Sequence, residues 1–298
     1  MDADAPIDLA IIGFATEDFS AHQDGRMLNH RSGCVVLILC LLLSTSFAGA
    51  GEKKKRLLLL GQSPDGHPRG THEYLPGVRL LAKLLSETSP LDVQVVNVDG
   101  AWEEGPRLLK EADGAVLFVS EGAKWASDDP RRLQALGELA SRGGGFTALH
   151  WGMGTRDAKN IAAFLKLFGG CHGGPDRKYK VVEAGAQVQE HPIASGLKNF
   201  RLKEEWYYRL KFVDAKDALK PVLRVPIEGN LETVCWAWRR TDGGRSFGFS
   251  GLHFHENWRL PQYQRLLAQG VLWTMKQPIP KGGIHVDDEV DEALLKLD

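Results

Sequence analysis

The sequence has few cysteines, almost no net charge and no long hydrophobic run. It contains 4 cysteines among 298 residues, too few for the disulfide framework of a small secreted domain. Its 37 basic and 38 acidic residues give a net charge of -1, without the basic surplus that binding to a nucleic-acid backbone requires. We therefore expect a globular protein that has no nucleic-acid partner.

The longest apolar run, residues 34–43 (CVVLILCLLL), is shorter than the roughly 20 residues of a transmembrane helix. It follows MLNHRSG, which begins at Met27, and precedes STSFAGA, so it has the basic start, apolar centre and small residues of a secretory signal. We expect cleavage after Ala48 or Ala50, export to the periplasm or the extracellular space, and no permanent membrane span. An uncleaved anchor is the alternative.

This signal sets the expected domain boundaries. Residues 1–26 look like no exported leader, and we interpret them as an over-long start of the coding sequence. We expect residues 27–50 to be the signal peptide, 51–280 a single domain and 281–298 a polar, acidic tail. Only Cys171 and Cys235 remain after cleavage, in no CxxC spacing for structural zinc, which leaves a single disulfide between them open.

Short apolar runs alternate with amphipathic segments in the first half of this domain. Strand patterns cover residues 57–62, 93–98, 115–119 and 146–150, and helical spacing covers 74–86, 106–112, 130–139 and 160–168. This alternation predicts an α/β sandwich with a parallel sheet covered on both faces. The later runs KYKVVEA, PVLRVP, TVCWAWRR and FGFSGLHF predict added antiparallel strands, and residues 261–275 predict a closing helix.

Six of the 10 histidines fall at predicted strand ends or in neighbouring loops: His67, His72, His150, His172, His253 and His255. Ligands of open α/β sheets bind at the carboxyl ends of the strands, so we expect these side chains at one edge. Imidazole is both an acid or base near neutral pH and the commonest metal ligand, and the sequence leaves both roles open. Any single one of them is more simply read as a loop histidine bonded to backbone. On a regular strand, His253 and His255 would share a face.

Paired carboxylates and exposed aromatics are further candidates. Glu204 and Glu205 precede WYY (residues 206–208), and they form either a solvated surface pair or the polar part of a sugar-stacking wall. Four tryptophans in predicted loops are candidates to line a pocket: Trp102, Trp125, Trp151 and Trp258. Trp236 and Trp238 alternate along a predicted strand and fit packing better.

Several ordered segments together resemble the ThuA-like (trehalose-utilisation) family. They are GQSPDGHPRGTHEYLPGVRLLAKLL, FTALHWGMG, FGGCHGGP, HPIASGL, EEWYY and GLHFHENWRLPQYQRLLAQGVLWTM, and the resemblance covers roughly residues 56–276. It implies a flavodoxin-like three-layer α/β sandwich similar to class I glutamine amidotransferases, with a mainly parallel sheet and added antiparallel strands. Those enzymes carry a nucleophilic cysteine after a central strand, where this chain has His150 and Trp151. Because the thiolate is the attacking group, we do not expect glutamine hydrolysis.

The family resemblance also implies chemistry on carbohydrates. ThuA-like proteins are associated with the breakdown of disaccharides through 3-keto sugars, which a separate sugar dehydrogenase produces. The turn after the first predicted strand reads GQSPDG and lacks the GxGxxG of a nicotinamide site, so that oxidation needs the partner enzyme. A ketone at C3 acidifies the hydrogen at C2, and a positioned base can then begin hydrolysis, elimination or isomerisation. The sequence identifies no cofactor with certainty. A divalent metal such as zinc is the candidate, and it would assist by polarising the ketone.

The resemblance and the strand-end positions assign a role to each candidate. Catalysis is assigned to His150, His253 and His255. Substrate binding is assigned to His67, His72, Glu73, Trp151, Glu205, Tyr208 and Trp258. A metal would be held by His150, His172 and His253. Two alternatives remain: a carbohydrate-binding protein without catalysis, and a metal-dependent hydrolase of another substrate.

Overall fold

The computed structural model describes residues 53–287, 295 and 297, and one compact unit, Gly51–Asp298, holds all of them. The predicted extension at 1–26 and signal peptide at 27–50 lie outside the described residues, as does most of the predicted tail beyond residue 287. No helix in the described part is long and apolar enough to cross a bilayer.

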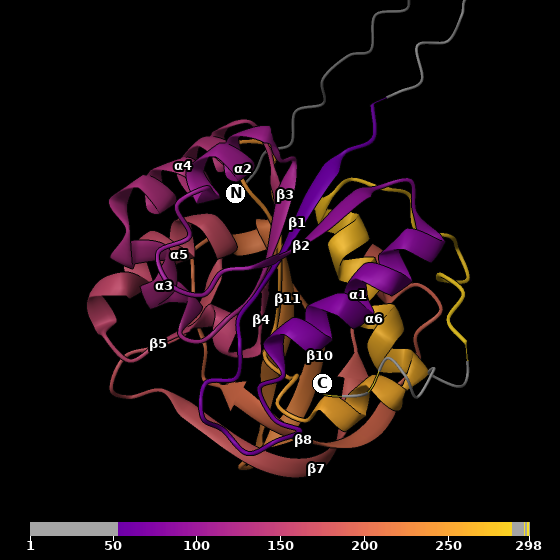
Figure 1. Cartoon of the computed structure of the whole chain (residues 1–298). Helices are drawn as coiled ribbons and strands as arrows, with labels where there is room; N and C mark the ends of the chain where they lie inside the picture. The colour runs from indigo at the N-terminus through magenta and orange to yellow at the C-terminus, as the bar shows by residue number, and fades with distance from the viewer. Residues whose placement is uncertain (1–52, 288–294, 296, 298) are drawn as a thin grey trace, which may run out of the picture. The chain divides into compact units, whose positions relative to one another are not determined.

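The centre of the unit is a large mixed sheet. Within the described residues its nine strands run in the order β2-β1-β3-β4-β12-β11-β10-β7-β8 (Figure 1). Its parallel half consists of β1 (Arg56–Gly61), β2 (Asp92–Asn97), β3 (Gly114–Phe118), β4 (Gly145–Leu149) and β12 (Arg245–Phe249). Its antiparallel half consists of β7 (Lys178–Val188), β8 (Phe200–Tyr208), β10 (Leu219–Ile227) and β11 (Asn230–Arg239). The predicted mainly parallel sheet with antiparallel additions is confirmed.

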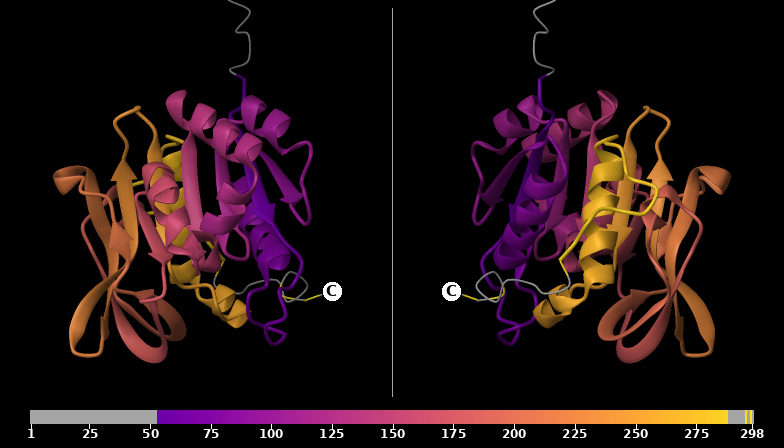
Figure 2. Two further views of the ribbon diagram at one scale, coloured as in Figure 1. Left: turned by 90° about the vertical axis from the view of Figure 1, so that its left-hand side faces the viewer. Right: turned by 90° about the vertical axis from the view of Figure 1, so that its right-hand side faces the viewer.

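Helices cover the parallel strands on both faces. On one face, α1 (Tyr74–Thr88) packs beside α6 (Pro261–Thr274). On the other face lie α2 (Gly105–Glu111), α3 (Gly122–Asp128), α4 (Pro130–Ser141) and α5 (Ile161–Phe168), as Figures 1 and 2 show. The unit is therefore the three-layer sandwich that the alternating pattern predicts.

Local sequence accounts for these elements. Leu57–Leu60 of β1 are fully buried because helices cover both faces of the strand. The start of α4 is fixed by Asp129, whose side chain accepts a hydrogen bond from the Arg131 amide, with Pro130 in the first turn. The pattern at residues 122–128 indicates no helix, yet the chain forms α3 there. Its seven residues place only Ala123, Trp125 and Ala126 as apolar buried contacts, too few for a periodic signal.

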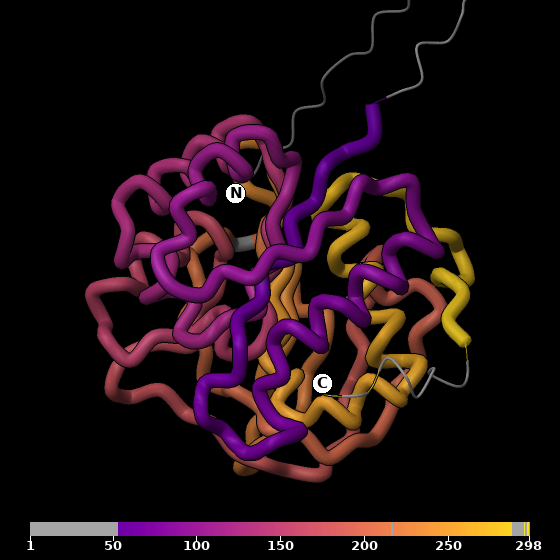
Figure 3. The backbone as a smooth tube through the Cα atoms, viewed as in Figure 1, coloured from indigo at the N-terminus to yellow at the C-terminus, as the bar shows by residue number. Residues whose placement is uncertain are grey.

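Two features at the carboxyl ends of the strands frame the candidate site. A small sheet joins β5 (Gly154–Thr155), β6 (Gly170–Gly173) and β9 (Lys211–Phe212). The loop after β1 pairs with the segment after β12 through an isolated bridge between Thr71 and Phe254, and Figure 3 shows these distant parts of the chain meeting. The fold thus gathers loops from both ends of the sequence at one edge.

The disulfide that the sequence leaves possible between Cys171 and Cys235 does not form. Cys171 and Cys235 are both free and buried. Burial raises the pKa of the Cys171 thiol to about 12, so neither the position nor the protonation state of this thiol suits a nucleophile.

Candidate functional site

Two buried histidines face each other at the end of the parallel sheet. His72 lies between β1 and α1, and His150 begins the 3-10 helix η1 (His150–Met153) directly after β4. Their Nε2 atoms are 3.0 Å apart. Both residues have left-handed backbone conformations, with φ of 53° and 46°, which residues other than glycine rarely adopt. Such strain is typical of positions where the surrounding structure holds a functional group in place.

Hydrogen bonds fix which nitrogen of each ring carries the proton. The Nδ1 of His150 lies 2.8 Å from the carbonyl oxygen of Ser250, which can only accept, so Nδ1 donates and Nε2 keeps its lone pair. The Nδ1 of His72 lies 3.2 Å from the Asp65 carboxylate, which also accepts a hydrogen bond from the Tyr74 hydroxyl at 2.6 Å. Both Nε2 lone pairs therefore point into the same space.

The protein environment disfavours a proton between these two rings. Burial, followed by the nearby His72, lowers the pKa of His150 well below its ordinary value, and burial also lowers the pKa of His72. Burial alone would raise the pKa of Asp65, but hydrogen bonds from His72, Tyr74 and His67 outweigh it and lower that pKa. An ionised Asp65 behind a neutral His72 is the arrangement that orients histidine ligands toward a metal ion.

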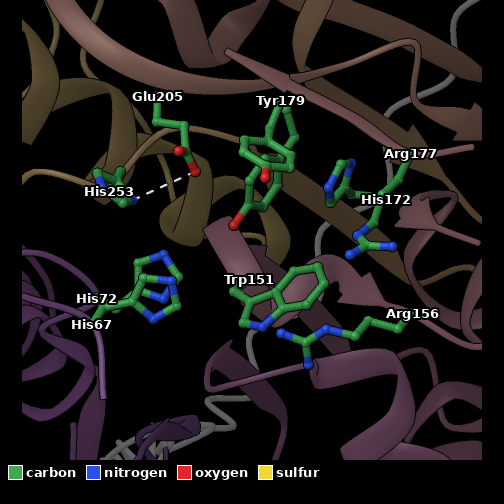
Figure 4. Close-up of a pocket in the computed structure, with 10 residues that line it drawn as sticks. His67, His72, Trp151, Arg156, His172, Arg177, Tyr179, Glu205 and His253 are labelled. Atoms are coloured by element: carbon green, nitrogen blue, oxygen red, sulfur yellow. Dashed lines mark ion pairs between the residues drawn. The ribbon is translucent and has the colours of Figure 1, made fainter. Parts of the chain in front are cut away.

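Glu205 on β8 and His253 after β12 complete this cluster. The Glu205 Oε1 atom lies 3.5 Å from His253 Nδ1 and 3.9 Å from His150 Nε2 (Figure 4 draws the first pair). One ligand atom from each of His72, His150, Glu205 and His253 lies within 4.8 Å of all the others. Burial and the neighbouring Glu204 carboxylate raise the pKa of Glu205 to about 7, and burial lowers the pKa of His253 to about 4. The four residues fit a divalent ion with an adjacent base.

Glu204 holds the His253 loop against the sheet. Its fully buried carboxylate accepts hydrogen bonds from the backbone amides of residues 205, 252, 253 and 254 and from the side chains of Asn257 and Tyr263. Burial raises the pKa of Glu204, and these donors oppose that rise. Adjacent carboxylates therefore have different tasks, since Glu204 fixes the backbone that carries His253 while Glu205 faces the pocket.

The pocket continues from this cluster along a line of aromatic rings. Tyr207 stacks on His150 with ring centroids 4.3 Å apart and on His172 at 3.9 Å. Its hydroxyl lies 3.0 Å from His150 Nε2. Beyond His172 lie Trp151 and two arginines, and Tyr179 of β7 stands at the mouth with 59% of its surface exposed (Figure 4). The cavity measures about 160 Å³.

The structure brings together six of the sequence-predicted site residues in this pocket: His67, His72, His150, His253, Trp151 and Glu205. A seventh predicted residue, His172, lies in the pocket wall but not in the metal cluster, because Tyr207 stacks between it and His150. His67 lies on the rim, where its ring stacks on His72 at 3.6 Å and its Nδ1 lies 2.6 Å from Asp65. The predicted metal set of His150, His172 and His253 thus differs from the set that the geometry favours.

Four predicted residues lie elsewhere. The strand that was expected to carry both His253 and His255 ends at Phe249, so the two residues do not share a face, and His255 lines a separate hollow beside Arg69. Trp258 is 1% exposed and packs near Tyr263. Glu73 accepts a hydrogen bond from the Gly70 amide, which closes the loop before α1. Tyr208 points away from Glu205 because successive residues of β8 face opposite sides.

Sequence reasoning assigned no site role to four residues that line the pocket, Tyr207, Arg156, Arg177 and Tyr179, or to Asp65 behind His72. Tyr207 had a usable signal, since a strand through residues 204–208 places it on the same face as Glu205. Arg156 stands close to Trp151 in the sequence, but no local pattern shows that its side chain turns back to the ring, and Arg177 reaches Trp151 only through the fold.

The sequence matches the profile of the ThuA family, described as trehalose utilisation, over residues 66–274. The chain belongs to the ThuA family. That match includes every strand of the large sheet except β1, and every residue of the metal cluster. A comparison with curated protein sequences gives no significant match.

One solved structure supports the fold of this ThuA protein, and two others are less similar to it. A ThuA-like protein from Bacteroides uniformis superimposes with a TM-score of 0.57 at 14% identity, covering 74% of this chain and 91% of that one. A GMP synthase protein from Thermoplasma acidophilum gives 0.40 at 12% identity over 75% and 94% of the two chains. The glutaminase domain of CTPS from Trypanosoma brucei, with bound acivicin, gives 0.39 at 12% identity over 80% and 100%. The first of these matches supports the mixed α/β fold.

Proposed function

We propose that this ThuA protein is an enzyme that acts on 3-keto sugars or keto-glycosides by proton transfer beside a divalent metal ion. The observation that carries the proposal is the pair of inward-facing Nε2 lone pairs of His72 and His150, 3.0 Å apart, next to a carboxylate whose pKa is raised to about 7. A cation held by both lone pairs would relieve their repulsion, and a base is most effective when its pKa lies near the working pH.

In this proposal His72, His150 and His253 hold the ion. Three protein ligands and one open position are typical of a catalytic zinc site. The ion would polarise the C3 carbonyl oxygen of the sugar. His253 Nδ1 is buried and has no hydrogen-bond partner within the described residues, which suits an atom reserved for a ligand.

Glu205 then moves the proton. Its carboxylate takes the hydrogen from C2 of the keto sugar, and the electron pair of that C–H bond moves toward the C3 carbonyl oxygen. The same carboxylate returns the proton to carbon in an isomerisation, or passes it to the leaving glycosidic oxygen in an elimination. The Tyr207 hydroxyl donates a hydrogen bond to the Nε2 lone pair of His150, 3.0 Å away, and a bound ion that took this lone pair would free the hydroxyl to donate to the sugar.

The test combines metal analysis with exchange at carbon. The purified protein is incubated with zinc, then with 3-keto-trehalose and 3-keto-glucosides in D₂O, while NMR follows deuterium at C2 and sugar release. We expect about one zinc per chain and deuterium incorporation that a chelator abolishes. A zinc-loaded protein that neither exchanges C2 hydrogen nor releases sugar would contradict the proposed reaction. Retained binding of the keto sugar in that case would favour a binding protein instead.

We also propose that the protein is exported and that a separate sugar dehydrogenase supplies its substrate. The secretory pattern at residues 27–50 supports export. Mass spectrometry of the protein isolated from its native cells should find a chain that begins at Gly49 or Gly51.

A further inference from the structure

The pocket is electrically asymmetric. One end holds the Glu205 carboxylate beside His72 and His253, and the other end holds Arg156 and Arg177 around Trp151 (Figure 4). The Asp65 carboxylate lies behind His72 at the first end. The guanidinium carbons of Arg156 and Arg177 lie 5.5 and 5.9 Å from the centre of the Trp151 ring. Nothing in the proposed proton transfer uses the two arginines, so their presence in the pocket wall needs another reason.

The two arginines differ in how their charge is balanced. Arg156 forms an ion pair with Glu121, and the same carboxylate accepts a hydrogen bond from the Arg156 amide. The Arg177 side chain has one hydrogen bond, from its Nη1 to the carbonyl oxygen of Gly174 at 3.2 Å, and no ion pair with any described residue. The nearest carboxylate in sequence, Asp176, is paired with Lys211 at 2.8 Å. Arg177 therefore brings an uncompensated positive charge to this end of the pocket.

The neutral wall next to Arg177 reinforces this charge. Burial, followed by the charges of Arg177 and Lys211, lowers the pKa of His172 to about 3, so this ring stays uncharged and leaves the arginine as the anion-binding group. Trp151 and Tyr179 provide flat apolar surfaces of the kind on which sugar rings stack. Tyr207 is stacked between His150 and His172, so these two histidine rings are separated by two stacking distances of 4.3 and 3.9 Å. One sugar residue with an exocyclic group is long enough to span that separation.

We propose that Arg177, assisted by Arg156, binds an anionic group of the substrate, so that the pocket selects an acidic sugar over a neutral one. This inference rests on the proposed function, because it places the sugar in the same pocket with its ketone at the histidine end. A guanidinium binds a carboxylate or a phosphate with two parallel hydrogen bonds, so both a uronic acid and a sugar phosphate meet the requirement. The ion pair with Glu121 makes Arg156 the weaker of the two contacts.

The test measures binding without turnover, which separates this inference from the proposed reaction. Calorimetry compares D-glucose, D-glucuronate and D-glucose 6-phosphate on the zinc-loaded full chain. We expect at least one of the two acids to bind about tenfold or more tightly than glucose, with a preference that weakens as salt increases. The tighter of the two acids identifies carboxylate or phosphate as the recognised group.

Variants then assign the preference to a residue. Arg177→Met should reduce the affinity for the preferred acid about tenfold and leave glucose unchanged, and Arg177→Lys should restore part of the loss. The matched control is Arg201→Met, which removes an arginine of β8 that is paired with Glu183 outside the pocket, and it should change nothing.

Three results would overturn the inference. They are equal affinities for all three sugars, no binding of any of them at millimolar concentration, and an Arg177→Met variant that loses glucose and acid equally. Turnover of neutral keto-glucosides together with any of these results would leave the proposed reaction standing and remove only the acidic-sugar preference.

Discussion

The two halves of the sheet supply the site in different ways. The parallel half contributes His72 and His150 from loops that follow the ends of β1 and β4. The antiparallel half contributes Glu205 and Tyr207 from within β8, where alternate side chains face the pocket. In the parallel half, position along the strand decides whether a residue reaches the site. In the antiparallel half, whether a residue of β8 reaches the site depends on whether its number is odd or even, because successive side chains of a strand face opposite sides.

This difference also separates two kinds of task. The strand-end histidines have strained backbones and few conformational alternatives, which suits ligands that must keep a fixed geometry. Glu205 stands on a regular strand with 14% of its side chain exposed, and it can reach the substrate side of the pocket. We therefore expect the parallel half to determine metal binding and the antiparallel half to determine proton transfer.

The largest expected effect is the loss of the metal from the parallel half. His150→Ala should reduce bound zinc from about one per chain to none and lower turnover on the order of a thousandfold, because the ketone loses its polarising ion. Elemental analysis and steady-state rates measure both. His285→Ala, which removes a histidine 89% exposed at its side chain, should leave both values intact. A His150→Ala variant with full zinc content would contradict the assignment of metal binding to the parallel half.

The next effect separates proton transfer from metal binding. Glu205→Gln should lower turnover and C2 deuterium exchange by about 10²–10⁴, since an amide cannot accept the proton, while zinc remains bound. The control Glu183→Gln changes an exposed carboxylate of β7 that is paired with Arg201. If Glu205→Gln loses its zinc as well, Glu205 is a ligand and the proposed base is wrong.

A smaller effect tests the parity argument on β8. Tyr207→Phe removes the hydroxyl 3.0 Å from His150 Nε2 and should lower turnover about tenfold, the equivalent of one lost hydrogen bond. Tyr208→Phe changes the next residue, which faces away, and should alter turnover less than twofold. Comparable losses in the two variants would show that strand parity does not select the working tyrosine.

The smallest effect concerns a histidine outside the pocket. Burial, followed by the charges of Arg239 and Arg245, lowers the pKa of His191 to about 4. The unfolded chain takes up a proton near pH 6.5, which the folded chain resists until about pH 4, so this group costs stability as the pH falls below 6.5. In His191→Asn the new side chain can still accept a hydrogen bond from the Ile193 amide but does not titrate. This variant should reduce the fall in Tm between pH 7 and pH 5 by a few degrees. An unchanged slope in a melting experiment would refute this assignment.

Much of the parallel half could be predicted from the sequence. Four buried apolar runs and the helical spacing between them predicted β1 to β4 with α1, α2, α4 and α5, and the strand-end rule pointed to His72 and His150. The antiparallel half was less predictable, because contacts with residues far away in the sequence, such as those of Glu204 with residues 252–254, set which face of β8 meets the pocket. That is why Tyr208 was expected in place of Tyr207, and why the sequence indicated a site role for Glu205 but not the backbone-holding role of Glu204.

His253 and His255 illustrate the same limit. Their spacing predicts a shared face only while the strand continues, but β12 ends at Phe249 and the chain then follows the carboxylate of Glu204. Likewise, Trp258 fits a loop aromatic in sequence, yet it is buried beneath α1. Loop paths of this kind depend on hydrogen bonds to partners about fifty residues away, which local pattern does not contain.

The buried carboxylate of Glu204 has a consequence for how the protein fails on heating. Leu252 is buried in the apolar core, but His253 and Phe254 are held by polar contacts, to the Glu204 carboxylate and to the backbone of the loop after β1. These two residues can therefore detach while the sheet stays intact. Such a local opening would carry His253 away from Glu205 and release the ion early. Heat inactivation would then precede melting of the fold, and an excess of zinc would bring the two temperatures together.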